Sequence, residues 1–281
     1  MPHIPSRRAA LVGLAATALG GCSAPGMFNA IVPGDAGATQ VAEGVAFGPS
    51  PRQKLDVYAP PDARGLPALL FIYGGSWRGG SRSDYGFVGR ALASRGMVVA
   101  VADYRLVPDV VYPGFVEDGA LALAFWRDNA ARFGGDPRKL FIMGHSAGAY
   151  NVMMVALDPP RGVALRGAIG LSGPYDFLPL DVSATRDAFG QFPDLAQTQP
   201  INRVTSRAPP MLLGTGGDDT TVYPRNTAAL AKRLRAAGRT VEERVYPGVG
   251  HVGTITAFAR PFRDGAPVLE DVVRFVRARA G

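Results

Sequence analysis

The sequence of 281 residues predicts an α/β fold built on one mostly parallel sheet. Several short runs are apolar at every position, as strands covered by helices on both faces require. Helical stretches separate these runs, so that strand and helix alternate along the chain. With 47% hydrophobic and 19% charged residues, no fixed repeat and no low-complexity linker, one large domain is expected. The apolar runs are residues 68–73, 97–102, 140–143, 168–171 and 211–213.

The first residues have the composition of an export signal. A Ser-Arg-Arg triplet precedes an apolar run that ends at Leu19, and two glycines then lead to Cys22. The run is too short to cross a bilayer as a helix, and small residues before a break are typical of a cleavage site. We therefore expect residues 1–21 to be an export signal peptide and residues 22–40, rich in Gly, Ala and Pro, to be a flexible tether.

Cys22 is the only cysteine of the chain, so it cannot form an internal disulfide. Its position after Leu-Gly-Gly resembles the lipobox of bacterial lipoproteins, and the Ser-Arg-Arg opening resembles a twin-arginine signal. The resemblance implies lipid attachment at Cys22, a possible membrane tether, and an exported protein in the periplasm or anchored in a bacterial cell envelope. Plain secretion without lipid is the alternative.

The net charge of +7 comes almost entirely from arginine, and the charges are scattered along the chain. The longest clusters are Arg7-Arg8 and Lys232-Arg233 with Arg235. A nucleic-acid binder normally concentrates such charges on one face with aromatic residues nearby. The sequence therefore favours a solvated basic surface and no nucleic-acid partner, with a basic surface beside an anionic membrane as the alternative.

Residues 41–281 are expected to form the catalytic domain. It opens with short strands at residues 44–47 and 54–58, which turn-forming residues 48–51 join as an antiparallel hairpin. A more polar strand at residues 241–246 fits the edge of the sheet. In parallel sheets ligands bind beyond the carboxyl ends of the strands, so the chemistry is expected there. The expected helices are residues 115–133, 147–157, 226–237 and 267–279.

A serine stands between two glycines where one apolar run ends, in Gly144-His145-Ser146-Ala147-Gly148. A strand that turns directly into a helix leaves little room, and the glycines allow the two segments to pass closely. The serine oxygen then projects above the sheet, beside the free N–H groups of the helix amino terminus. In this strand–turn–helix context, Ser146 is predicted to be a nucleophile.

A serine needs a base that removes its proton, and histidine has the pKa for this role. Of the three histidines, His3 lies in the leader and His145 adjoins the serine in an unsuitable direction, which leaves His251 in a glycine-rich loop after the last strand. A carboxylate must orient the base. We choose Asp219, which follows the run 211–213, and the adjacent Asp218 is the alternative.

Two backbone donors are needed for the negative oxygen of a tetrahedral intermediate. Glycines follow the first long apolar run and let the backbone turn towards the serine. The N–H groups of Gly75 and Ser76, together with that of Ala147, are the expected oxyanion hole.

The chain at this point resembles an α/β-hydrolase over nearly all of residues 44–281, and its order of serine, aspartate and histidine is the one expected for that fold. It is similar to the hormone-sensitive-lipase-like, feruloyl-esterase-like and kynurenine-formamidase-like esterases. At the oxyanion loop those enzymes carry His-Gly-Gly-x-Trp or His-Gly-Gly-Gly, where this chain has Tyr73-Gly-Gly-Ser-Trp77. Around the serine they carry Gly-Glu-Ser-Ala-Gly-Gly, and this chain has His145 in place of the glutamate and Ala149 in place of the last glycine. The resemblance implies that three segments brace the site without doing chemistry, namely residues 103–106, 112–113 and 117–118.

Other chemistries fit less well. Residues 248–253 match the glycine pattern of a dinucleotide site, but that fold needs a further strand after its helix. Ser172 is a rival serine, yet proline occupies the second glycine position and no helix is expected there. With three histidines and one cysteine, no zinc cluster is visible. No metal and no cofactor are expected.

Residues 172–208 form the longest stretch without clear periodicity, and its aromatic residues could supply a small cap over a substrate pocket. An ordinary packed loop is equally compatible with this segment. Tyr175 and Trp77 are the expected substrate contacts, although Trp77 could instead pack against the sheet.

The sequence therefore predicts an exported serine carboxylesterase that acts on a small-molecule ester through Ser146, His251 and Asp219. An amidase of the formamidase kind or a peptidase is the alternative within the fold. A non-catalytic binding protein on a hydrolase scaffold is the alternative from another class. The sequence does not indicate the natural ester or the oligomeric state.

Overall fold

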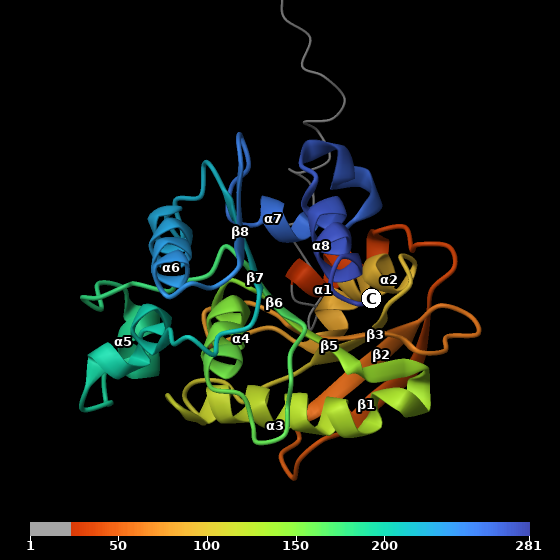
Figure 1. The fold of residues 1–281 in the computed structure, drawn as a ribbon, viewed down its shortest axis with the longest axis horizontal. Coiled ribbons are helices and arrows are strands. Elements are labelled where there is room, and N and C mark those ends of the chain that lie inside the picture. Colours follow the sequence, from red (N-terminus) through yellow and green to blue (C-terminus); the bar gives the residue numbers. More distant parts are fainter. Residues whose placement is uncertain (1–23) are drawn as a thin grey trace, which may run out of the picture.

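Eight strands form one sheet in the computed structural model, which describes residues 24–281 (Figure 1). The strands are β1 (Thr39–Ala46), β2 (Lys54–Ala59), β3 (Leu66–Ile72), β4 (Val98–Ala102), β5 (Gly135–His145), β6 (Gly167–Leu171), β7 (Met211–Gly216) and β8 (Val241–Tyr246). Their order across the sheet is β1-β2-β4-β3-β5-β6-β7-β8. The pairs β1–β2 and β2–β4 are antiparallel and every other pair is parallel. The predicted fold class and the amino-terminal hairpin are therefore confirmed.

Burial along the strands follows from their composition. All residues of the inner strand β4, Val-Val-Ala-Val-Ala, are buried, because helices cover both of its faces. The edge strand β8, Val-Glu-Glu-Arg-Val-Tyr, is mostly half-buried and carries charge. Charged side chains on an edge strand discourage pairing with another chain. The strand predicted as an edge from its polarity is the last strand of the sheet.

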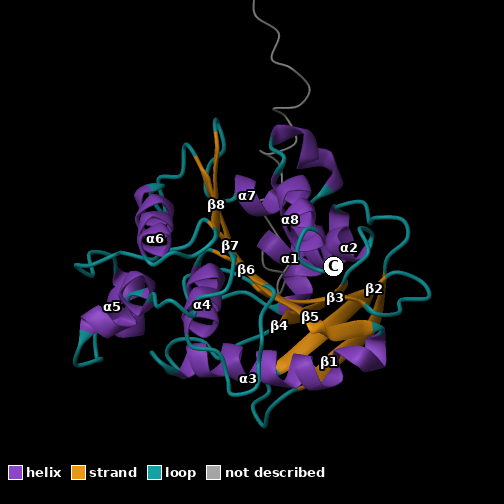
Figure 2. Cartoon of the chain, viewed as in Figure 1, coloured by secondary structure: helices purple, strands orange, loops and turns teal. Residues whose placement is uncertain are grey.

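Helices cover both faces of the sheet (Figure 2). In the views of Figures 1 and 2, α3, α4 and α6 lie on one side of it and α2 and α8 on the other. The helices are α1 (Ala24–Ile31), α2 (Gly86–Ala93), α3 (Gly114–Asn129), α4 (Ala147–Leu157), α5 (Ser183–Phe189), α6 (Arg225–Ala236), α7 (Gly253–Thr256) and α8 (Val268–Arg277). Short 3-10 helices are η1 (Arg82–Tyr85), η2 (Ala130–Phe133), η3 (Leu195–Thr198), η4 (Pro200–Arg203) and η5 (Arg260–Gly265).

Helix α2 shows why the sequence pattern missed an element. Its sequence, Gly-Phe-Val-Gly-Arg-Ala-Leu-Ala, holds two glycines, which weaken the intrinsic preference for a helix. Tertiary packing explains one of them, because a Cβ at Gly89 would lie 2.3 Å from Cδ2 of the Tyr58 ring. The helix therefore packs against β2 at a distance that only glycine allows.

The structure corrects the expectation of a flexible tether at residues 22–40, because most of this segment is docked on the domain. The ring of Phe28 in α1 contacts Phe87 and Phe262, with centroids 5.3 and 5.7 Å apart. Asp35 accepts two hydrogen bonds of 2.7 Å from the guanidinium of Arg263. Composition suggested a linker, but aromatic packing and a bidentate ion pair fix the segment in place. The predicted signal peptide and Cys22 lie outside the described residues.

Asn29 links α1 to the start of α2. Its Oδ1 accepts hydrogen bonds from the Phe87 backbone N–H at 2.8 Å and from Arg90 Nη2 at 2.9 Å. Its Nδ2 donates to the carbonyl oxygen of Ser83 at 2.7 Å. The first N–H groups of a helix lack partners within it, so Asn29 caps α2 from a distant part of the chain.

Replacing this cap tests the docking of α1. Asn29→Ala leaves the Phe87 N–H without its partner and is expected to lower the free energy of unfolding by about 1–2 kcal/mol. Urea denaturation followed by circular dichroism measures the change, with Asn129→Ala as the control, since the Asn129 amide bonds only within its own helix and to a nearby arginine. Equal stability of the Asn29→Ala variant and the wild-type chain would show that α1 is not held in this way.

Candidate active site

Ser146 lies in the turn between β5 and α4, at φ 55° and ψ −126°. An L-residue adopts this backbone conformation only under strain, which the surrounding packing must impose. A Cβ at Gly144 would lie 2.3 Å from the carbonyl oxygen of Gly148, and a Cβ at Gly148 would lie 2.2 Å from that of Ile72. Both glycines are thus required because backbone segments cross where a side chain would stand.

Three side chains that are far apart in the sequence form one hydrogen-bonded line. Nε2 of His251 lies 2.8 Å from Oγ of Ser146, and Nδ1 of His251 lies 2.8 Å from Oδ2 of Asp219. A carboxylate can only accept, so Nδ1 carries a proton and Nε2 is the acceptor for the serine hydroxyl. The structure brings together the three residues that the sequence predicted.

The two neighbouring aspartates have different surroundings. Asp219 is buried, and its second oxygen accepts hydrogen bonds from the backbone N–H groups of Thr221 and Val222 at 3.0 and 2.8 Å. These two donors hold the carboxylate against His251. The side chain of Asp218 is exposed, and its backbone N–H donates to the carbonyl oxygen of Val249. Asp219, and not Asp218, therefore faces the imidazole.

Backbone contacts join the loop that carries the acid to the loop that carries the base. The N–H groups of Gly217 and Asp218 donate to the carbonyl oxygens of Tyr246 and Val249 at 2.8 and 3.0 Å. A Cβ at Gly216 would lie 2.1 Å from the Val249 oxygen, so glycine is needed for this approach. The separation of Asp219 and His251 thus depends on backbone hydrogen bonds as well as on their side chains.

The loop after β3 turns through unusual backbone conformations beside Ser146. Gly75, Ser76 and Trp77 have φ angles of 123°, 53° and 57°. Ser76 and Ala147 line the same cleft as Ser146. Among residues 24–281, no group accepts a hydrogen bond from the backbone N–H of Gly75, Ser76 or Ala147. Of the three expected oxyanion donors, Ser76 and Ala147 border the cleft directly, whereas Gly75 is not among its lining residues.

Gly74 is a residue of the site that sequence analysis missed. A Cβ there would lie 2.8 Å from Cβ of Ser146 and 3.0 Å from the His145 carbonyl oxygen. A side chain at this position would therefore displace the nucleophile. The pair of glycines in the sequence carried this signal, but only the second glycine was assigned a role.

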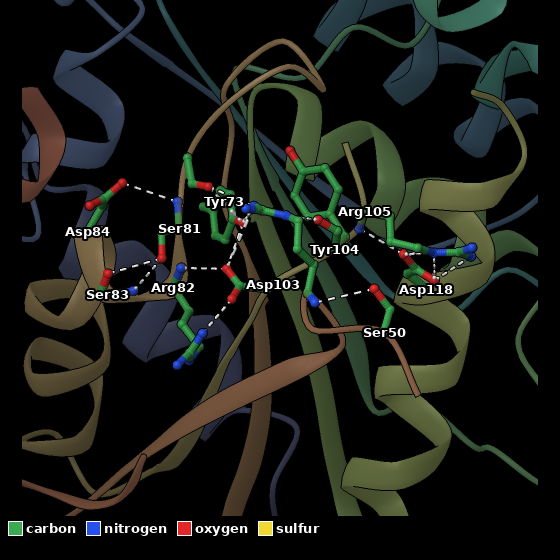
Figure 3. Close-up of polar contacts among 12 residues, drawn as sticks. Ser50, Tyr73, Ser81, Arg82, Ser83, Asp84, Asp103, Tyr104, Arg105 and Asp118 are labelled. Carbon is green, nitrogen blue, oxygen red and sulfur yellow. Dashed lines mark hydrogen bonds and ion pairs between the residues drawn. The ribbon is translucent and has the colours of Figure 1, made fainter. Parts of the chain in front are cut away.

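Tyr73, the residue before this loop, stands where similar esterases carry histidine and is held by a polar network (Figure 3). Its hydroxyl donates to Oδ1 of Asp103 at 2.8 Å and accepts from Nη2 of Arg52 at 2.8 Å. Arg82 donates to the other oxygen of Asp103 at 2.6 Å. Burial, and then the charge of Asp103, raises the pKa of the Tyr73 hydroxyl far above its usual value, so it remains a donor.

A second ion pair, Arg105 with Asp118, fixes the first part of α3 (Figure 3). Asp118 is buried and accepts hydrogen bonds from Nη2 and Nε of Arg105 at 2.8 and 2.9 Å, from the Arg105 backbone N–H at 2.8 Å and from Gln53 at 2.7 Å. Neither pair lies among the residues that line the cleft. Asp103 and Asp118 thus have the bracing positions that the resemblance implied.

A cleft of about 340 Å³ opens beside Ser146 and is mainly apolar. Trp77 forms part of its floor, where its Nε1 donates to Asn151 at 3.1 Å and its ring packs against Phe189 at 4.9 Å. The ring is buried and borders the cleft, as a substrate contact would, and its aromatic contacts are with α3, α4 and α5 rather than with the sheet. The lining residues are Ser76, Trp77, Ser146, Ala147, Pro174, Phe177, Leu178, Pro179, Asp181, Val182, Ala184, Thr185, Thr220, Thr221, Val222, Tyr223, Arg225 and Asn226.

The structure corrects the expectation for Tyr175. This side chain is fully buried, its hydroxyl lies against Gly170, and it is not among the residues that line the cleft. The neighbouring Phe177 borders the cleft instead. Part of the segment 172–208, including α5, forms one wall of the cleft. The periodicity of the sequence could not show which of these aromatic residues faces inward.

A family model and several curated proteins are similar in sequence to this chain. The BD-FAE family model matches residues 55–234. A probable isoprenylcysteine alpha-carbonyl methylesterase of Arabidopsis thaliana is 28% identical over 85% of this chain and 64% of its own length. Esterase LipC of Mycobacterium tuberculosis is 31% identical over 74% of this chain and 58% of its own length. The chain thus spans about six-tenths of these curated relatives.

The architecture is also found in solved structures. A crystal structure of esterase B from Lactobacillus rhamnosis superposes with a TM-score of 0.80 at 21% identity, covering 92% of this chain and 91% of that chain. At this identity the similarity concerns the fold. Because the BD-FAE match extends over more than half of the chain, the protein belongs to the BD-FAE family, and its fold is that of the α/β-hydrolases.

Proposed function

We propose that this chain hydrolyses carboxylic esters through an acyl-enzyme intermediate on Ser146. The observation that carries the proposal is the line of hydrogen bonds from Asp219 through His251 to Ser146, which ends in a cleft beside available backbone donors. Both sequence relatives described above bear names of esterases, which supports the same chemistry.

Acylation follows from the geometry. Ser146 Oγ forms a bond to the ester carbonyl carbon while its proton passes to Nε2 of His251, 2.8 Å away. The carbonyl electrons move to oxygen, which the N–H groups of Ser76 and Ala147 stabilise; one such donor is typically worth about 10²–10³ in turnover. His251 then returns the proton to the leaving alkoxide as the ester C–O bond breaks. Asp219 accepts from Nδ1 and stabilises the imidazolium.

Deacylation repeats these steps with water. Water attacks the acyl carbonyl carbon and gives its proton to His251, and the tetrahedral carbon then releases Ser146 Oγ, which recovers the proton. The acid leaves the cleft and the free enzyme is restored.

The shape of the cleft indicates the kind of ester. Its volume of about 340 Å³ is near the lower end for small-molecule sites, so the group beside Ser146 is compact. Exposed apolar side chains continue from the cleft to the surface: Leu178 is 38% exposed, Val182 53% and Tyr223 54%. Such an apolar rim favours an ester with a compact group at the serine and a longer apolar group across the rim.

Two other functions make different predictions. An amidase or peptidase of the same fold uses the same three residues but must protonate an amine leaving group. A binding protein on a hydrolase scaffold needs no reactive serine. The complete hydrogen-bonded triad argues against the binding protein, and the esterase names of the sequence relatives favour ester over amide hydrolysis.

We also propose that the chain is exported and anchored through a lipid on Cys22. The apolar leader, the cysteine after Leu-Gly-Gly and the Ser-Arg-Arg triplet support this proposal. Among residues 24–281, no helix is long and apolar enough to cross a membrane.

The reactive serine is tested with a fluorophosphonate probe and a set of substrates. Wild-type protein is expected to be labelled at Ser146 and to hydrolyse p-nitrophenyl esters faster than an aminoacyl amide or N-formylkynurenine. Ser146→Ala is expected to lose both labelling and about 10⁴-fold or more in kcat, as in other triads. Absence of labelling would support the binding protein, and amide turnover without ester turnover would support the amidase.

The role of the acid is tested by a matched pair of variants. Asp219→Asn keeps the shape of the side chain but favours the wrong tautomer of His251, so kcat is expected to fall by about 10³–10⁴-fold. Asp218→Asn, one residue away and exposed, is expected to keep kcat within about twofold. Steady-state kinetics on one p-nitrophenyl ester compare them, and the reverse result would assign the acid to Asp218.

The apolar rim is tested by chain length. We expect kcat/KM to rise with the length of only one of the two chains, acyl or alcohol, because the other must stay compact beside Ser146. Val182→Ser is expected to reduce the ratio of long-chain to short-chain kcat/KM by about threefold to tenfold, since each buried methylene is worth about 0.8 kcal/mol. Val41→Ser removes an exposed valine remote from the cleft and serves as the control. A ratio that responds equally to both substitutions would exclude the rim as a binding surface.

A further inference from the structure

Three polar side chains outside the triad connect to the backbone carbonyl oxygen of His251. Nε2 of His145 lies 3.1 Å from this oxygen, and Oγ1 of Thr254 lies 3.0 Å from it. Oγ of Ser172 lies 3.0 Å from Oγ1 of Thr254. His145 precedes the predicted nucleophile Ser146, and Ser172 is the serine that was set aside as a rival nucleophile. Both are therefore connected to the backbone of the base.

The directions of these hydrogen bonds follow from the groups involved. A carbonyl oxygen only accepts, so His145 carries its proton on Nε2, and Thr254 directs its hydroxyl proton to the same oxygen. Thr254 has no second proton, so the Ser172 hydroxyl must donate to Thr254. The His251 carbonyl therefore receives two donors, and a third hydroxyl orients one of them.

Burial makes this arrangement costly unless it is satisfied. His145, Ser172 and Thr254 are all buried, and Ser172 has a φ of 49°, which is strained for serine. Burial, followed by the nearby His251 ring 5.0 Å away, lowers the pKa of His145 to about 3. His145 thus stays neutral at ordinary pH and remains a single-proton donor while His251 is charged during turnover.

The backbone that is held in this way needs such support. His251 stands in the glycine-rich segment 248–253, and Val252 beside it is 60% exposed. The imidazole itself is bonded only to Asp219 and Ser146. The imidazole therefore depends on its backbone for its position along this line, and the carbonyl of the same residue is tied to β5 through His145, to α7 through Thr254 and, through Ser172, to the end of β6.

We propose that His145, Thr254 and Ser172 are positioning residues that hold the His251 imidazole in line between Asp219 and Ser146. This inference rests on the proposed hydrolase function. An enzyme loses rate steeply when a reacting group moves, with about 10²-fold lost for a 1 Å displacement. Loss of one donor leaves the other in place, while loss of both leaves the half-buried residue His251 with a carbonyl oxygen that has neither partner.

Isosteric variants separate positioning from general stability. Thr254→Val removes the hydroxyl and keeps the shape, and Thr254→Ser restores the hydroxyl. Thr198→Val is the matched control: Thr198 is also buried, donates to a backbone carbonyl at 2.6 Å and accepts from a neighbouring side chain at 2.8 Å, but lies outside this network. Each variant is measured for thermal unfolding and for kcat and KM with p-nitrophenyl acetate.

Positioning predicts a specific pattern. Thr254→Val is expected to lower kcat about tenfold with KM changed less than twofold, Thr254→Ser to recover most of kcat, and Thr198→Val to lose similar stability but keep kcat. His145→Leu combined with Thr254→Val is expected to lower kcat by more than the product of the single effects. If Thr254→Val and Thr198→Val have the same kcat as each other, the inference is wrong.

A spectroscopic measurement distinguishes failure of this inference from failure of the proposed function. The proton on Nδ1 of His251, shared with Asp219, gives a downfield ¹H NMR signal that needs no substrate. A shifted or broadened signal in Thr254→Val, with an unchanged signal in Thr198→Val, supports positioning even if wild-type protein hydrolyses no ester. An unchanged signal in both variants overturns it whatever the activity.

Discussion

The close crossing of backbone segments around Ser146 is the constraint on which the site depends. Where β5 turns into α4, the carbonyl oxygens of Gly148 and Ile72 occupy the space that side chains on Gly144 and Gly148 would need. The strained backbone of Ser146 is possible only because these segments pack so closely. The same crossing places the amino terminus of α4, and thus the Ala147 N–H, beside the serine oxygen. The crossing of these backbone segments therefore positions both the nucleophile and one of the oxyanion donors.

Much of the fold could be predicted because its strands are unambiguous. Runs such as residues 97–102 are apolar at every position, and only a sheet covered on both faces hides them. The serine and the histidine of the site could also be identified from the sequence. Elimination among three histidines leaves His251, and Ser146 stands between two glycines with a distinctive spacing. Asp219 could be distinguished from Asp218 only by the structure, because adjacent residues share the same sequence context and differ in the direction of their side chains.

What the sequence could not provide is long-range packing. Helix α2 is stable despite its glycines because it packs on Tyr58, and α1 is docked through Asn29 and Phe28 rather than by its own composition. Tyr175 and Phe177 are two positions apart in an irregular segment, where no period indicates which side chain is buried. The polar contacts to the His251 carbonyl were likewise invisible, since they join residues from three distant parts of the chain.

The hydrogen bonds from Gly217 and Asp218 to Tyr246 and Val249 have a consequence for how such a protein can diverge. Two loops that share backbone contacts cannot be exchanged one at a time without changing the spacing of the groups that they carry. Recombination among relatives, whether natural or in the laboratory, should therefore succeed when both segments come from one parent. The wall formed by residues 177–185 has no such tie to them and can vary in sequence and length while the chemistry stays the same.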